Sequence, residues 1–204
     1  MTVPAGQSET IIILDFGSQY AQLIARRVRE NGVYSVLARP DVTLEEIKGL
    51  NPKGFIFSGG PASVYDKGAP ACRKEIFELG VPILGICYGM QIGSKMLGAD
   101  VKGAPSREYG RTSLSVRSAD VLLKNVPAET TVWMSHGDQV QRLGDDFIPL
   151  AATPTCPIAA VKHKTKPFYG VQFHPEVTHT PHGGEIFVNF LYDICGCQGL
   201  WRMG

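Results

Sequence analysis

The run from Gly85 to Gly89 is the part of the sequence best suited to carry chemistry. It reads Gly-Ile-Cys-Tyr-Gly, follows an apolar stretch that begins at Val81, and precedes a helical pattern. A strand that turns through Gly-x-Cys-x-Gly into a helix is the cysteine form of a nucleophile elbow; its glycines allow a sharp turn and keep side chains clear. A helix N-terminus also favours the thiolate. Cys87 is therefore the candidate nucleophile, and the alternative is a small buried packing residue.

A cysteine nucleophile needs a base, and His174 is the candidate. It follows an apolar stretch, and Glu176 lies two residues further on. Side chains two apart in an extended segment share a side, and a carboxylate beside an imidazole fixes its tautomer and stabilises the imidazolium. Alone, His-Pro-Glu fits a loop histidine without a role equally well. Combined with the elbow, it predicts a Cys87–His174–Glu176 set, which requires no metal.

A third element is the run Ser-Gly-Gly-Pro from Ser58 to Pro61. Consecutive glycines permit a turn that points backbone N–H groups inward, as an oxyanion hole requires. The alternatives are a plain turn and the Ser-Gly-Gly-x-Asp-Ser loop of ATP pyrophosphatases. Ala62 stands where that loop has Asp, which counts against it. Dinucleotide binding is not favoured either, because no Gly-x-Gly-x-x-Gly follows the first predicted strand.

Zinc binding is a further alternative, because three histidines crowd together and two cysteines follow them. These residues are His174, His179, His182, Cys195 and Cys197. None of their spacings matches a usual zinc site, so we expect no metal.

The elements that must position these residues alternate between strand and helix in the first half of the chain. Apolar, β-branched runs predict buried strands, and amphipathic runs between them predict helices. The expected strands are 11–14, 33–38, 54–57 and 81–86, and the expected helices are 21–28, 44–50, 69–79 and 88–97. This order predicts an α/β fold with an open, mostly parallel central sheet and helices on both faces.

The second half of the chain has a different pattern, with short strands separated by Pro- and Gly-containing turns. The expected strands are 113–116, 130–134, 147–152, 158–161 and 168–173, and a closing helix is expected over 184–195. They predict an antiparallel extension of the same sheet. We expect one domain over residues 11–204, after a flexible N-terminal tail at residues 1–10.

Composition excludes several classes of protein. The 204 residues are 44% hydrophobic and 19% charged, with a formal net charge of +1, so neither a nucleic-acid surface nor an anionic-membrane surface is expected. Arg26, Arg27 and Arg29 are expected to form a solvated helix face. No apolar run approaches the roughly 20 residues of a membrane span. Five irregularly spaced cysteines and no signal-peptide pattern predict free thiols and a cytoplasmic location.

With these residues in hand, the sequence resembles the class I (triad) glutamine amidotransferases, and within them the glutaminase domains of GMP synthetases. The general pattern is Gly-x-Cys-x-Gly-x-Gln at residues 85–91 and the later His-x-Glu at His174 and Glu176. Four stretches resemble the GMP synthetase group in particular: residues 13–20, 87–91, 133–138 and 169–179. The resemblance covers roughly residues 11–201 and implies a flavodoxin-like fold.

The resemblance implies a role for each matching residue. Cys87 would attack the side-chain amide of L-glutamine, and His174, oriented by Glu176, would act as general base and acid. The backbone N–H groups of Gly60 and Tyr88 would hold the oxyanion. Three residues would position the amino-acid end of the substrate: Gln91, and the backbone around His136 and Gly137. A structural role for His136 in its loop is equally compatible with the sequence.

The resemblance also implies a partner. Complete GMP synthetases add an ATP-pyrophosphatase domain, which no part of these residues matches, so ATP and Mg²⁺ would belong to a synthetase domain or subunit elsewhere. We expect an isolated domain or a separate glutaminase subunit, with no cofactor of its own and slow or no turnover alone. Two other readings stay open: a peptidase-like cysteine hydrolase of the same fold, and a non-catalytic domain that binds a partner.

Overall fold

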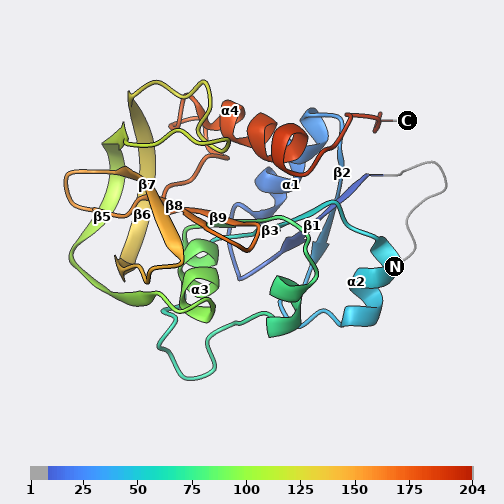
Figure 1. Ribbon diagram of the computed structural model, residues 1–204, viewed down its shortest axis with the longest axis horizontal. Coiled ribbons are helices and arrows are strands. Elements are labelled where there is room, and N and C mark those ends of the chain that lie inside the picture. Colours follow the sequence, from blue (N-terminus) through green and yellow to red (C-terminus); the bar gives the residue numbers. More distant parts are fainter. Residues whose placement is uncertain (1–8, 204) are drawn as a thin grey trace.

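The centre of the molecule is one sheet in the order β2-β1-β3-β4-β9-β8-β7-β5-β6, seen in a computed structural model that describes residues 9–203 (Figure 1). The strands are β1 (Thr10–Leu14), β2 (Tyr34–Ala38), β3 (Gly54–Phe57), β4 (Ile83–Ile86), β5 (Asp100–Val116), β6 (Glu129–Arg142), β7 (Phe147–Ala152), β8 (Ala160–His163) and β9 (Phe168–Val171). From β2 to β9 neighbouring strands pair in parallel, and from β9 to β6 they pair antiparallel. The predicted α/β fold with an antiparallel extension is confirmed.

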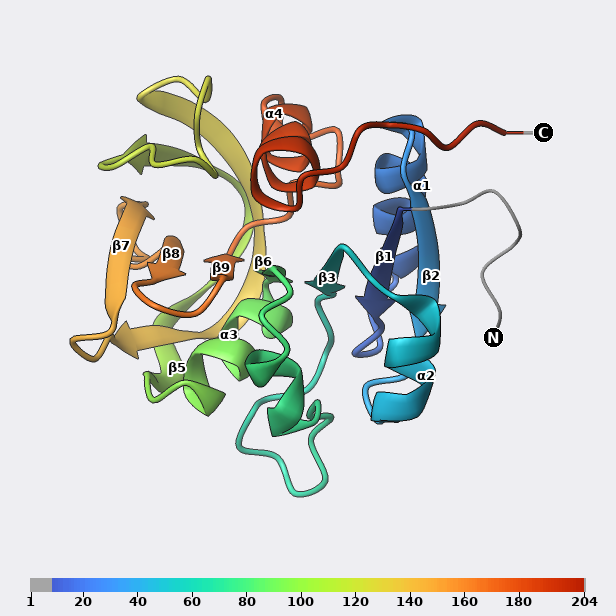
Figure 2. The same cartoon turned by 45° about the vertical axis from the view of Figure 1, so that its right-hand side comes forward.

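Helices cover both faces of the parallel part (Figures 1 and 2). They are α1 (Ala21–Glu30), α2 (Leu44–Leu50), α3 (Tyr88–Met96) and α4 (Gly183–Val188), with a 3₁₀ helix at Lys74–Glu78 and a π-helical segment at Asn189–Ile194. Because strand side chains alternate, Ile11 and Ile13 pack with α1 and α4, whereas Ile12 and Leu14 pack with α2 and α3. Burial on both faces explains why these strands read as continuous apolar runs.

Three expected elements differ from the structure. The helix expected over 69–79 is only the 3₁₀ helix Lys74–Glu78, which buries only Ile76 and Phe77; Pro70 disfavours a helical conformation at Ala69, the first residue of the expected helix. The strand expected over 113–116 is the end of β5, which begins at Asp100, and the strand expected over 130–134 is part of β6. Residues 102–112 of β5 are largely solvent-exposed and polar, so no apolar pattern marks them.

The N-terminal boundary of the predicted domain is also wrong at two residues. Glu9 and Thr10 are buried, and the Glu9 carboxylate accepts hydrogen bonds from the backbone N–H groups of residues 198–200. Trp201 N–H donates to the carbonyl of Gly32 at 2.8 Å. Residues 9 and 10 thus belong to the folded unit, fastened to the C-terminal segment; the rest of the expected tail, 1–8, lies outside the described residues.

The arginines of α1 do not form one solvated face. Arg26 is exposed and pairs with Glu30, as expected. Arg27 donates to the carbonyl of Glu176 at 3.0 Å, and Arg29 donates to the Ser35 hydroxyl at 3.0 Å. Two of the three arginines therefore tie α1 to neighbouring segments. None of the helices within residues 9–203 combines the length and apolar character that a bilayer crossing needs.

Candidate active site

Cys87 occupies a strained turn between β4 and α3. Its φ of 52° and ψ of −111° place a non-glycine residue in the positive-φ region, as at other nucleophile elbows. The neighbouring glycines allow backbone segments to pack closely. A Cβ on Gly89 would lie 2.3 Å from the Phe57 carbonyl oxygen, and one on Gly85 would lie 2.6 Å from the Gly89 oxygen. The predicted elbow is present, with the sharp turn at the cysteine itself.

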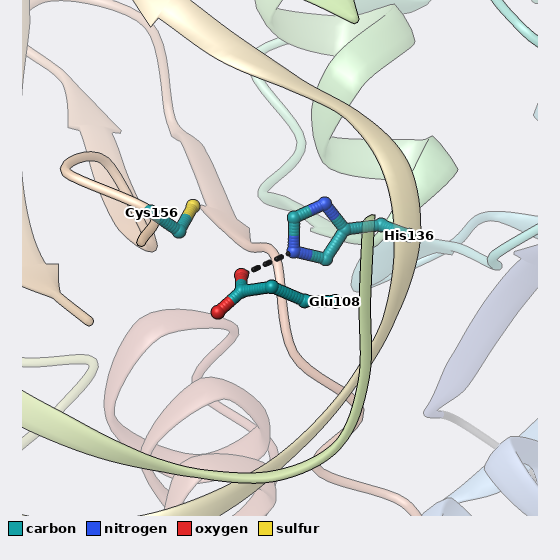
Figure 3. Close-up of side chains that lie close together, drawn as sticks. All are labelled: Glu108, His136 and Cys156. Carbon is teal, nitrogen blue, oxygen red and sulfur yellow. Dashed lines mark hydrogen bonds and ion pairs between the residues drawn. The ribbon is translucent and has the colours of Figure 1, made fainter. Parts of the chain in front are cut away.

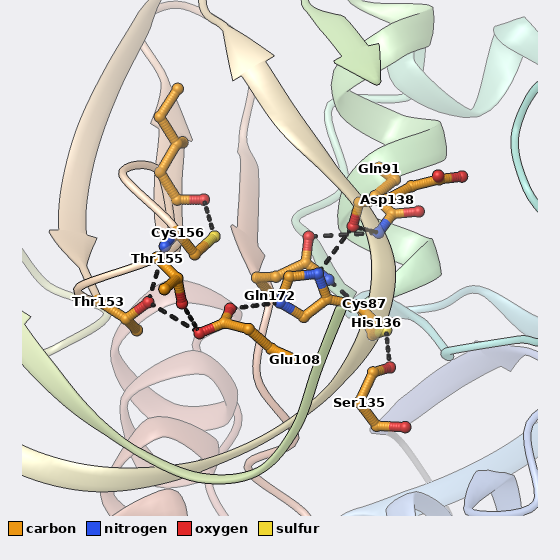
Figure 4. Close-up of polar contacts among 11 residues, drawn as sticks. Cys87, Gln91, Glu108, Ser135, His136, Asp138, Thr153, Thr155, Cys156 and Gln172 are labelled. Atoms are coloured by element: carbon orange, nitrogen blue, oxygen red, sulfur yellow. Dashed lines mark hydrogen bonds and ion pairs between the residues drawn. The ribbon is translucent and has the colours of Figure 1, made fainter. Parts of the chain in front are cut away.

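Strand pairing brings Cys87 beside the segment that follows β9. The Cys87 N–H donates to the Val171 carbonyl at 2.9 Å, because β4 and β9 are parallel neighbours. The next residue, Gln172, is fully buried and directs its Nε2 at the Cys87 Sγ at 3.6 Å. The thiol lies 3.5 Å from the Ser135 carbonyl oxygen of β6 (Figure 4). Three strand segments therefore fix the position of the sulfur atom.

His174 and Glu176 form a buried pair at the same edge of the sheet. The His174 Nδ1 lies 2.7 Å from Glu176 Oε1, and the Glu176 side chain is 0% exposed. A Cβ built on Gly59 would lie 3.2 Å from His174 Cε1 and 3.5 Å from Cys87 Cβ, so both side chains converge over Gly59. Because Glu176 occupies Nδ1, Nε2 is the nitrogen available for proton exchange. Cys87, His174 and Glu176 are called the elbow set below.

The electrostatics of the elbow set favour a charged imidazole. Burial by itself lowers the pKa of His174, but hydrogen bonding to Cys87 and Glu176 raises that pKa to about 10. The second Glu176 oxygen has no hydrogen-bond partner among the described residues. A buried carboxylate in this position requires a positive partner, and the imidazolium is the group that supplies it. A protonated His174 beside Cys87 is the arrangement that supports a thiolate.

The glycine loop after β3 packs against the loop after β1. The Ser58 hydroxyl accepts from the Phe16 N–H at 2.9 Å, and a Cβ on Gly60 would lie 2.3 Å from the Phe16 oxygen. Gly60 is thus held against the Phe16 backbone, and it lines the same two cavities as Cys87. Tyr88 is the first residue of α3, and the first helical bond runs from Gln91 N–H to the Cys87 carbonyl, so the Tyr88 N–H has no acceptor within its helix.

Two adjoining cavities meet at Cys87. Their volumes are about 330 and 380 Å³, within the range of small-molecule sites, and both are lined by Gly60, Cys87 and Ser135. The first extends toward His174, and the second toward Gln91 and the backbone of β6 around Gly137. A larger hollow of about 670 Å³ lies at the β2 edge of the sheet, and no cysteine or histidine lines it.

Two of the predicted substrate-binding residues, Gln91 and His136, line the second cavity and also make hydrogen bonds within the protein. The His136 side chain is 1% exposed; its Nδ1 lies 2.9 Å from the Asp138 carbonyl oxygen and its Nε2 lies 2.8 Å from Glu108 Oε2 (Figure 3). Gln91 Nε2 donates to the same Asp138 oxygen at 2.8 Å. His136 belongs to strand β6 instead of a loop; both of its ring nitrogens face acceptors within the protein, and the residue also lines the second cavity. The backbone from Ser135 to Gly137 remains as the cavity wall.

Several residues at the site carried no separate prediction. Gln172 and Ser135 contact the nucleophile, and the Tyr20 ring packs edge-on against His174 with centroids 5.6 Å apart. Arg107 and Tyr109 line the second cavity from the part of β5 that the sequence does not mark as a strand. Alternation along the segment after β9 could have indicated Gln172, but no local signal identifies Arg107.

The remaining thiols and histidines are placed differently. All five cysteines are free, and burial raises the pKa of both Cys72 and Cys156 to about 12. Among the zinc ligands weighed from the sequence, His182 pairs with Glu185 and His179 stacks on Trp133. Within residues 9–203 the group of potential metal ligands that does come together is a different one, Glu108, His136 and Cys156.

Comparison with known proteins identifies the family of this chain. The family model of class-I glutamine amidotransferases matches residues 12–194. A protein named GMP synthase (glutamine-hydrolysing) from Acetivibrio thermocellus is 54% identical over 196 residues, covering 96% of this chain and 38% of the relative. Its namesake from Bacillus cereus is 53% identical over 203 residues, covering 100% of this chain and 39% of the relative. The chain thus spans less than two-fifths of the length of these relatives.

Solved structures show the same architecture. A protein described as a GMP synthase subunit from Thermoplasma acidophilum superposes with a TM-score of 0.83 at 37% identity, covering 91% of this chain and 93% of that one. A glutamine amidotransferase from Thermotoga maritima shares the fold with a TM-score of 0.72 at 18% identity, covering 93% of this chain and 98% of that one. The chain is therefore an enzyme that belongs to the class-I glutamine amidotransferases.

Proposed function

We propose that this chain hydrolyses L-glutamine to glutamate and ammonia through a thioester on Cys87. The observation that carries the proposal is the convergence of Cys87, at a positive-φ elbow, with the buried His174–Glu176 pair at the mouth of two cavities. A cysteine nucleophile activated by an oriented imidazole is the arrangement that acyl transfer requires.

The proposed reaction uses these groups in two stages, formation and hydrolysis of the thioester. The Cys87 sulfur attacks the amide carbon, and the oxyanion is held by the N–H groups of Gly60 and Tyr88. The His174 Nε2 gives its proton to the departing nitrogen, which leaves as ammonia. His174 then takes a proton from water and the hydroxide attacks the thioester, which expels the Cys87 thiolate; His174 keeps its proton, so the starting pair is restored, and the new carboxylic acid of glutamate releases its proton to solvent. Glu176 keeps the imidazole in the tautomer that both steps need.

The second cavity accommodates the amino-acid end of glutamine. Its wall is the β6 backbone around His136 and Gly137, which Gln91 holds in place through the Asp138 carbonyl. The guanidinium of Arg107 on the same cavity offers a charge for the α-carboxylate. This arrangement favours glutamine over an extended peptide substrate, because a free α-carboxylate meets a cation there.

We also propose that the ammonia serves an ATP-pyrophosphatase domain or subunit that converts XMP to GMP, in purine biosynthesis. The similarity to GMP synthases over nearly all of this chain supports it. ATP and Mg²⁺ would be used there, and hydrolysis at Cys87 needs no cofactor. A reducing, cytoplasmic location is the one in which five free cysteines persist.

The test is intact mass after treatment with a glutamine-analogue diazoketone, which does not depend on fast turnover. We expect one adduct, blocked by excess glutamine and lost in Cys87→Ala. An adduct that glutamine does not block, together with turnover of peptides or esters, would identify a hydrolase of another specificity. No adduct, with or without a synthetase domain present, would leave a non-catalytic domain and overturn the proposal.

A further inference from the structure

A second group with a cysteine, a histidine and a glutamate lies behind the wall of the second cavity, to which it contributes His136. Glu108 comes from β5, His136 from β6 and Cys156 from the turn between β7 and β8 (Figure 3). One ligand atom of each lies within 4.8 Å of the other two. Cys156 is fully buried, and the Glu108 side chain is 11% exposed. These three residues are called the second Cys–His–Glu set.

The hydrogen bonds of His136 leave a place for a cation. Its Nδ1 faces the Asp138 carbonyl oxygen at 2.9 Å, and a carbonyl can only accept, so Nδ1 carries a proton. The Nε2 faces the Glu108 carboxylate at 2.8 Å, and a carboxylate also only accepts. Two atoms with lone pairs at this distance need a positive species between them. That species is either a proton or a metal ion.

The surroundings have the form of a metal site's outer shell. A metal-binding histidine donates its other ring N–H to a carbonyl or carboxylate, and a ligating carboxylate is itself hydrogen-bonded. Here the Asp138 carbonyl fixes the His136 ring, and Glu108 Oε1 accepts from the hydroxyls of Thr153 and Thr155. The hydroxyl of Thr153 also accepts from the Cys156 N–H at 2.9 Å, which fixes the turn.

We propose that Glu108, His136 and Cys156 bind one thiophilic divalent cation of the Zn²⁺ class. Thiolate, imidazole and carboxylate are the three ligand types that Zn²⁺ takes in proteins, and three protein ligands leave a fourth position for water. Binding forms a metal–sulfur bond and releases to solvent the Cys156 thiol proton and the proton between His136 and Glu108. The set departs from the sequence-based expectation of no metal, because sheet pairing assembles it from three distant segments.

The competing arrangement is a network held by protons alone. In it the Cys156 thiol donates to the Ile158 carbonyl at 3.4 Å, and a proton stays between His136 and Glu108. The two arrangements differ in whether the Cys156 sulfur, the His136 nitrogen and the Glu108 oxygen coordinate one metal ion. A probe that reports sulfur coordination distinguishes them.

The test is a Co²⁺ titration of the full chain carrying Cys87→Ala, which removes the competing thiol of the elbow set. We expect one equivalent to bind, with thiolate-to-cobalt charge-transfer absorption and the intense visible bands of four-coordinate Co²⁺. Zn²⁺ should displace it. Adding Cys156→Ser should abolish the charge-transfer band and weaken binding by at least about 100-fold.

Matched variants make the result decisive. Cys72 is another buried free thiol whose pKa is raised to about 12, so Cys72→Ser in the same background should leave the spectrum and affinity unchanged. Glu108→Gln keeps the side-chain shape and should weaken Co²⁺ binding by about tenfold or more, with near-ultraviolet circular dichroism reporting an intact fold. The absence of a charge-transfer band at one equivalent, or a band that survives Cys156→Ser, would overturn the proposal.

Discussion

The elbow set and the second Cys–His–Glu set contain the same three residue types and differ in how the imidazole is bonded. In the elbow set the glutamate takes Nδ1, which leaves Nε2 for the cysteine. In the second set a backbone carbonyl takes Nδ1 and the glutamate takes Nε2, so neither nitrogen remains to exchange a proton with the thiol. The three residue types therefore do not by themselves make a catalytic triad. What matters is that the glutamate binds one ring nitrogen of the histidine and leaves the other to exchange a proton with the thiol.

The supporting backbone reinforces this difference. Cys87 lies at the carboxyl ends of parallel strands, where α/β sheets place their ligands, and its positive φ presents the sulfur to two cavities. Cys156 lies in a turn on the antiparallel side and directs its thiol to a carbonyl. Figure 4 shows a chain of polar contacts that runs from the Cys156 backbone N–H, through His136 and Gln172, to the Cys87 sulfur, while the Cys156 thiol lies outside that chain. In the proposed function, the parallel half supplies the nucleophile and the antiparallel half supplies the wall of the substrate cavity.

The largest effect expected from the comparison is at the two glutamates. Glu176→Gln should lower glutamine hydrolysis by about 10² to 10⁴-fold, because a side-chain amide can donate to Nδ1 and force the proton onto Nε2. Glu108→Gln should lower it by less than about tenfold, since Glu108 acts only through His136. The measurement is glutamate release with a synthetase partner present, or the rate of diazoketone adduct formation. Equal losses in the two variants would contradict the proposed division of roles.

The next effect concerns pH and stability. The pKa of His174 is raised from 6.5 to about 10 in the folded chain, so the native state holds a proton that the unfolded chain releases. This contribution is fully present below about pH 6.5 and is lost as the pH rises through about 10. Across that window the free energy of unfolding should fall by up to about 1.4 kcal/mol per pH unit.

Urea unfolding of the unmodified chain and of His174→Gln/Glu176→Gln at several pH values measures this effect. The double variant removes both charges, so its stability should lack this fall. A stability difference between the two proteins that stays constant from pH 6.5 to 10 would show that the imidazole is already neutral in the folded state, and the thiolate would then need another partner.

The strands that could be predicted from the sequence are those that are buried on both faces of the sheet. Strands β1, β3 and β4 are fully buried and read as continuous apolar runs, so their positions are predicted to within two residues. The first part of β5 could not be predicted. It is largely exposed, contains Gly103 and Pro105, and is held by pairing with β6 across a register shift between Gly103 and Glu108. Its strand character depends on a distant partner, which local sequence does not report.

The same distinction between local and distant signals applies to the two Cys–His–Glu sets. The convergence of Cys87, His174 and Glu176 was predicted, because an elbow motif and a strand-end histidine are each visible locally. The second Cys–His–Glu set was not, since Glu108, His136 and Cys156 share no motif and meet only through the antiparallel pairing of β5 with β6 and β7. A site whose residues meet only through the pairing of distant antiparallel strands becomes visible in the structure, whereas a site at a strand-to-helix turn is marked by a local motif in the sequence.

The smallest expected effect on reactivity is at Gln172, which lies where the parallel and antiparallel parts of the sheet meet. The amide of Gln172 donates to the Cys87 sulfur at 3.6 Å and its oxygen accepts from Gln91 at 3.3 Å, so in the proposed mechanism it would stabilise the attacking sulfur and connect it to the wall of the second cavity. Gln172→Leu should slow diazoketone adduct formation by about tenfold, since a hydrogen bond to a charged group contributes about 1.5 kcal/mol or more. Gln139→Leu is the matched control: it removes another buried amide, one whose oxygen lacks a partner among the described residues. It should change the rate by less than about twofold, and an equal slowing in both variants would mean that Gln172 acts only through packing.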